Sequence, residues 1–87
     1  MPEIASAVRF YFAHAMGARA LARSWRRSAQ ESLECARRAT PDQRAKWLRY
    51  AEKNEDEAYR CVLRAFEYVG YAKRAKAEVR HEQRHAA

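Results

Sequence analysis

The chain has 87 residues, enough for one small domain spanning residues 1–87, and a core of this size is marginal without a partner. Its two isolated glycines exclude phosphate-binding loops and dinucleotide-binding fingerprints. Lysine and arginine total 18 against 11 acidic residues, a formal net charge of +7. That balance favours an anionic partner, either nucleic acid or an acidic protein surface.

Good helix formers (Ala, Arg, Glu and Leu) dominate the composition, and no run alternates apolar and polar residues as a half-buried strand does. The sequence therefore predicts an all-α protein. Two architectures fit, an antiparallel helical hairpin and a three-helix bundle.

Residues 4–38 carry a long 4-3 repeat, which is typical of a helix that packs along another helix. Its members are Ile4, Val8, Tyr11, Ala15, Ala18, Ala22, Trp25, Ala29, Ser32 and Ala36. The many alanines predict a close approach between the two helices.

A second stripe of small residues lies about a third of a turn from this seam. It consists of Ala13, Gly17, Ala20, Ser24 and Ser28. A hairpin partner covers only one stripe, so the second indicates either a third helix or another subunit. We expect self-association, most simply as a homodimer.

The next helix starts at about residue 41. In "ATPDQRAKW", Thr40 fits the N-cap position, Pro41 the first helical position, and Gln43 the capping-box position. The first helix must end near Arg38, because the residue before a proline avoids the helical conformation. The connection is too short for anything except antiparallel helices.

A second capping box stands in "EKNEDE", where Asn54 precedes Glu57 by three residues. Either a break near residue 54 starts a last helix over residues 55–84, or one helix continues through it. The following segment is rich in apolar residues and predicts the centre of the core: Ala58, Tyr59, Val62, Leu63, Ala65, Phe66, Val69 and Ala72. Gly70 within it indicates close packing or a bend.

Arginines cluster on the first helix without an intervening acid, and further cations begin the second helix. The candidate site for nucleic acid or an acidic partner is Arg19, Arg23, Arg26, Arg27, Arg37, Arg44, Lys46 and Arg49. Trp25 and Trp47 could stack on bases, but Trp25 belongs to the seam and is expected to pack there.

The C-terminal "HEQRH" spells the zinc-protease motif, with His81 and His85 one helical turn apart. Only Ala86 and Ala87 follow it, so the downstream third ligand of such enzymes has no place. Glu78, His81 and His85 make at most a weak metal site, and we predict no resident metal or other cofactor. No catalytic grouping stands out, and the protein is predicted not to be an enzyme.

Cys35 and Cys61 fall too far apart along an antiparallel hairpin to pair, so both are expected to be buried free cysteines. With His14 they loosely resemble the helical copper-sensing repressors. Those proteins carry a His four residues before the second Cys, whereas this chain has Glu57 there.

We therefore expect a basic helical protein that works by binding, acting through nucleic acid or a complex that contains it. The alternative is a small inhibitor or adaptor that docks on a host protein; in size and style the chain resembles phage and mobile-element modules such as anti-CRISPR and host-takeover proteins. No segment is apolar enough for a membrane span, and neither a membrane nor a small-molecule substrate is expected. A cytoplasmic location is the default expectation.

Overall fold

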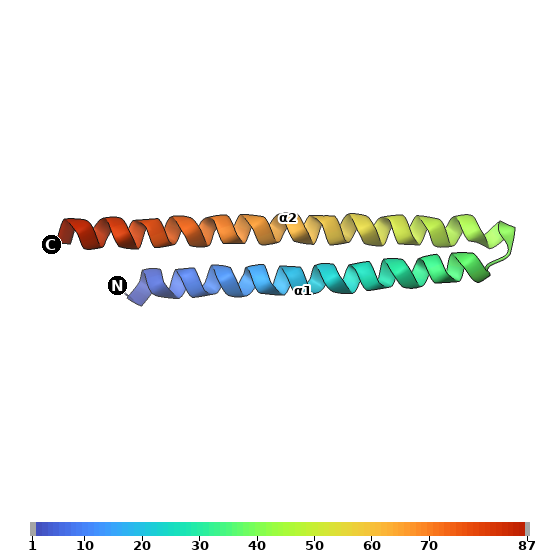
Figure 1. The fold of residues 1–87 in the computed structure, drawn as a ribbon, viewed down its shortest axis with the longest axis horizontal. Coiled ribbons are helices and arrows are strands. Elements are labelled where there is room, and N and C mark those ends of the chain that lie inside the picture. The colour runs from blue at the N-terminus through green and yellow to red at the C-terminus, as the bar shows by residue number, and fades with distance from the viewer. Residues whose placement is uncertain (1, 87) are drawn as a thin grey trace.

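Two long helices lie side by side and antiparallel (Figure 1). The structure is a computed structural model that describes residues 2–86, with the side chains of residues 5–85. Helix α1 spans Pro2–Arg38 and helix α2 spans Pro41–Ala86, and together they form a rod of 71 × 14 × 12 Å. The predicted hairpin is confirmed. A three-helix bundle is wrong, because residues 2–86 contain two helices only.

The turn is as short as the sequence predicts. Only residues 39 and 40 separate the helices, and α2 begins at Pro41. The carbonyl oxygen of Thr40 accepts hydrogen bonds from the backbone N–H groups of Gln43 and Arg44, both at 3.0 Å. The Arg44 Nε donates to the carbonyl oxygen of Ala36 at 3.3 Å. The same carbonyl also accepts the backbone N–H of Ala39 at 3.4 Å, and the Arg44 bond ties the two helices together at the turn.

Of the two alternatives near residue 54, the continuous helix is the one that forms, because α2 runs through Asn54 without a break. Asn54 is half-buried where α2 meets α1, three residues after buried Ala51 and four before buried Ala58. A capping signal is local and contributes about 1 kcal/mol. Packing along the whole of α1 outweighs it here, so the helix continues.

The core is a seam of small residues between the two helices. On α1 the seam predicted from the 4-3 repeat is confirmed: its alanines and Ser32 are buried, and Val8, Tyr11 and Trp25 are half-buried. Ile4 lies outside the described side chains. On α2 the buried residues are Ala51, Ala58, Cys61, Ala65, Ala72 and Ala75.

The pairing register follows from residues that share a hollow between the helices. Ala22 lies beside Ala65, and Val8 lies beside Val79. These pairs are 14 residues apart on each helix, so a seven-residue repeat is in step on both. The same register sets Ala29, which is 0% exposed, opposite Ala58, which is 1% exposed.

Many large apolar side chains lie outside this core. The prediction that residues 58–72 form the core centre holds only for their alanines, because Tyr59 and Phe66 are each 64% exposed and Leu63 is exposed too. Met16 and Phe10 are exposed on α1. Alanines at the seam bring the helix axes close, and large side chains are left to project from the flanks.

The rod exposes more surface than a compact protein of the same mass. Its accessible surface is 7,020 Å². About 5,300 Å² is expected for a compact monomer of 10.2 kDa. The difference is about twice the roughly 800 Å² that each partner contributes to a standard protein interface. The elongated shape of the two-helix rod accounts for this excess.

Gly70 neither permits close packing nor marks a bend, contrary to the sequence prediction. It lies inside α2, and a Cβ added there would meet nothing within 4 Å. Gly70→Ala should therefore stabilise the protein by about 0.5–1 kcal/mol, because alanine loses less backbone entropy on folding. Thermal denaturation should show a melting temperature roughly 2–8 °C higher. A lower melting temperature would show that the position is packed after all.

Candidate nucleic-acid interface

Cations from both helices gather along one flank of the hairpin. We call this flank the basic face and define it by Arg9, Arg19, Arg23 and Arg26 of α1 and Lys73, Lys76 and Arg80 of α2. Residues seven apart on two helices that pack along their length stay on the same side. Arg19 and Arg26 are related in this way, as are Lys73 and Arg80. The other flank, on the far side of the seam, we call the opposite flank.

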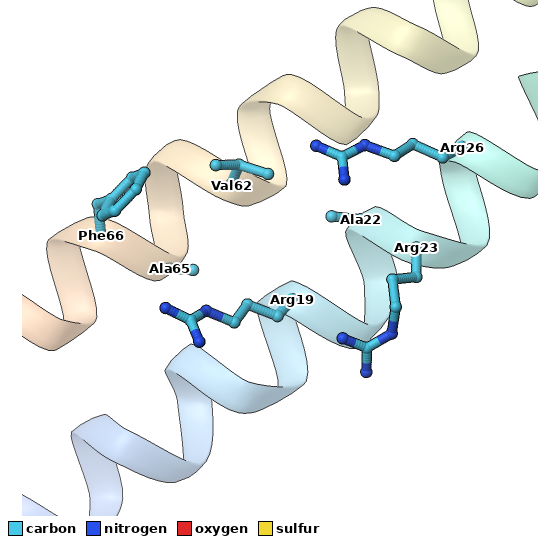
Figure 2. Close-up of a pocket in the computed structure, with 7 residues that line it drawn as sticks. All are labelled: Arg19, Ala22, Arg23, Arg26, Val62, Ala65 and Phe66. Carbon is cyan, nitrogen blue, oxygen red and sulfur yellow. The ribbon is translucent and has the colours of Figure 1, made fainter.

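The centre of the basic face is a shallow hollow between the helices, of about 340 Å³ (Figure 2). Ala22 and Ala65 form its floor, and Val62 and Phe66 line it from α2. Arg19 and Arg26 extend from α1 towards α2, whereas Arg23 points away from α2. Two guanidinium groups and one exposed aromatic ring thus line the same hollow, with Val62 between Phe66 and Arg26.

A second hollow, of about 400 Å³, continues the face towards the chain termini. Arg9 lines it from α1, and Lys76 and Arg80 line it from α2. Between the two hollows, the Lys76 Nζ lies 5.6 Å from the centre of the Phe12 ring. The face therefore alternates cations with apolar and aromatic surface over roughly 25 Å of the 71 Å rod.

No acidic residue lies among the cations of the basic face, over residues 9–26 of α1 and 59–80 of α2. Helix α1 has no acid between Glu3 and Glu31. Beyond Ala58, α2 has Glu67 and Glu78, which lie on the opposite flank, and Glu82, which is half-buried. The two ion pairs found among residues 5–85 join Arg37 to Glu34 and Arg60 to Glu57, each at 2.9 Å. Neither involves a cation of the basic face, so its positive potential is not neutralised there.

The structure brings together only three of the eight cations predicted from sequence, namely Arg19, Arg23 and Arg26. Arg27 lies on the side of α1 that faces away from α2, near Glu31 and Glu34. Arg37 is paired with Glu34, although it also lines a hollow near the turn beside Arg44.

The remaining three predicted cations lie on α2 and serve other contacts or none. Arg44 donates its Nε hydrogen to the end of α1. The Lys46 Nζ lies 5.8 Å from the Tyr50 ring centre and 6.0 Å from that of Trp47, on the opposite flank. Arg49 is exposed on the side of α2 away from α1.

Sequence reasoning missed the half of the basic face that α2 supplies, together with Arg9. Lys73, Lys76 and Arg80 join the α1 arginines only through the antiparallel register. A signal for it was present, because Ala51, Ala58, Ala65 and Ala72 recur every seven residues and mark the seam of α2. Counting from that seam places each cation of α2 on its flank.

Aromatic residues on the opposite flank are arranged differently. Near the termini, Tyr11 lies 5.4 Å from Tyr71, and His14 stacks on Tyr68 at 5.2 Å, both measured between ring centres. The Arg74 guanidinium lies 5.2 Å from the Tyr71 ring centre. These rings contact one another across the two helices and help hold the ends of the hairpin together.

The small-residue stripe predicted for self-association runs along α1. Ala13, Gly17, Ala20 and Ser24 are exposed, and Ser28 is half-buried. A homodimer through this stripe stays a prediction. Light scattering that finds a monomer at high micromolar concentration would contradict it.

The C-terminal histidines do not form a metal centre with Glu78. His81 and His85 lie with ring centres 4.2 Å apart. Among the described residues, no group of three or more His, Cys, Asp or Glu side chains is arranged to hold a metal ion. Both cysteines are free; Cys61 is buried in the seam as predicted, whereas Cys35 is only half-buried.

Two further findings bear on what kind of protein this is. Within the described part of the chain, neither helix has a stretch both long and apolar enough to cross a membrane. In comparisons with known proteins, no protein family, no curated protein and no solved structure matches this chain.

Proposed function

We propose that this protein binds nucleic acid through the basic face and catalyses no reaction. The observation that carries the proposal is the segregation of charge: cations from both helices line one flank, and acids in the same stretch lie on the other flank or in the seam. Arginine binds phosphate with a planar, two-pronged guanidinium, and Arg19 and Arg26 extend over one hollow. A row of such groups suits a phosphate backbone better than a single small anion.

Salt dependence tests this proposal. For a single strand, the logarithm of the binding constant falls with the logarithm of salt by about 0.7 for each phosphate contacted. Four contacts would weaken binding roughly 50-fold between about 50 and 200 mM salt. Fluorescence anisotropy with labelled single- and double-stranded probes measures both the affinity and the slope. Failure to bind either probe at low salt would refute the proposal.

A second candidate is docking on another protein, as a small inhibitor or adaptor. The observation in its favour is the apolar strip on α2 formed by Tyr59, Leu63 and Phe66, all exposed. Exposed apolar patches of this kind mark protein interfaces. A pull-down from nuclease-treated lysate distinguishes the two candidate functions. A protein partner that the wild-type chain retains and the Leu63→Lys variant loses would favour docking. Loss of every retained protein on nuclease treatment would count against it.

A further inference from the structure

Two exposed aromatic rings on α2 lie on the same flank as the cations of the basic face. Phe66 lines the central hollow beside Arg19 and Arg26. Tyr59 precedes Phe66 by seven residues and so lies on the same side of α2. At 1.5 Å per residue, the two rings are roughly 10 Å apart along the helix axis. Each ring can therefore take a separate planar group.

Packing within the hairpin does not account for these two rings. Each residue is 64% exposed, so neither contributes much to the core. On the opposite flank, Tyr11, His14 and Tyr68 stack on other rings. No other ring within residues 5–85 stacks with Tyr59 or Phe66. One flank therefore pairs its aromatic side chains internally, and the basic face leaves two of them open.

Open rings beside arginines match the chemistry of unpaired bases. Every base has a planar face that stacks on an aromatic side chain, and proteins that bind single strands combine such rings with a basic groove. A duplex offers its phosphates to the arginines, but its base faces are stacked inside. The rings can therefore contribute only when the bases are unpaired.

We propose that the basic face selects single-stranded over double-stranded nucleic acid, with bases stacking on Phe66 and Tyr59 while Arg19 and Arg26 bind the phosphates. This inference rests on the proposed function, because it assumes that the basic face is the binding surface. It adds a substrate class, and it assigns a selective role to two residues that carry no charge.

The test uses the full chain with a labelled single strand long enough to span the 71 Å rod, and with the blunt duplex of the same sequence. Wild type should bind the single strand about tenfold more tightly than the duplex, since one stacked base contributes that much or more. Phe66→Leu should weaken single-strand binding about tenfold and change duplex binding less than about twofold.

Phe10→Leu is the matched control. Phe10 is also exposed, at 55%, but lies on the opposite flank against Tyr11 and His14. This variant should bind both probes as wild type does, and circular dichroism should show that both variants keep the helical fold.

The outcomes separate this inference from the proposed function. Equal affinity for single strand and duplex, unchanged in Phe66→Leu, would overturn the selectivity and leave nucleic-acid binding intact. If the protein binds neither probe, both the single-strand selectivity and the proposed nucleic-acid binding are wrong. Binding to vesicles of anionic lipid, with no binding to either probe, would also overturn both and identify the face as a membrane-binding surface.

Discussion

Replacing Arg19, Arg23 and Arg26 together by glutamate should weaken binding to a single strand by at least about 100-fold. At about 0.1 M salt, each phosphate contact contributes roughly 1 kcal/mol through release of counterions, so three lost contacts amount to roughly 100-fold. Three new carboxylates on the same hollow then repel the phosphates. Fluorescence anisotropy with the labelled single strand measures the loss.

A charge-matched control distinguishes the basic face from net charge alone. Arg60→Glu, Arg64→Glu and Arg74→Glu, combined in one chain, reverse three arginines on the opposite flank of α2. Both triple variants carry a formal charge of +1, because three reversals remove six units from +7. The control variant should keep most of the affinity. Equal losses in the two variants would show that binding depends on overall charge and has no defined face.

Replacing Ala58 by leucine should destabilise the hairpin by about 1–3 kcal/mol. Ala58 is 1% exposed and lies opposite Ala29, which is 0% exposed. The added carbons have no free space, so the helices must separate locally or the side chain must adopt a strained rotamer. Separation at one point also loosens neighbouring alanine contacts along the rigid helix. Chemical denaturation followed by circular dichroism measures the change in free energy of unfolding.

Ala77→Leu is the matched control for this prediction. Ala77 lies in the same helix, but it is exposed, on the side away from α1. Leucine is nearly as good a helix former as alanine, so this variant should unfold within about 0.5 kcal/mol of wild type. If Ala58→Leu proves as stable as Ala77→Leu, close alanine packing does not hold the two helices together.

The hairpin was predictable because its signals are local or strictly periodic. Thr40 and Pro41 mark the start of α2 within a few residues, and the 4-3 repeat of α1 identifies its packed side over ten positions. At Asn54 the choice between a break and a continuous helix stayed open for the same reason. The capping signal of Asn54 is also local. The residues around it do not reveal the packing against α1, and that packing outweighs the signal.

The location of the large apolar residues could not be predicted by counting them. Residues 58–72 contain both alanines and large side chains, and an apolar count favours the large ones as the core. The distance between the helices decides which residues can form the core, and the alanines of both helices set that distance. Ala65 meets Ala22 in the seam, and Phe66, the next residue of the helix, therefore lies on the flank.

The candidate site was predictable in part, for a related reason. Arg19, Arg23 and Arg26 are neighbours on one helix, and their spacing alone brings them together. Lys76 and Arg80 are 50 or more positions away in sequence, and only the pairing register places them on the same flank. Arg44 shows the converse case, since a cation that looked available for binding donates a hydrogen bond at the turn.

The central claim is that one flank of the hairpin binds nucleic acid. Mapping of backbone amide chemical shifts by NMR, during titration with an unlabelled single strand, tests it most directly. We predict that the largest shifts follow Arg19, Arg26, Phe66 and Lys76, while Arg60 and Arg64 on the opposite flank stay unchanged. Shifts concentrated on the opposite flank, or no shifts at low salt, would contradict it.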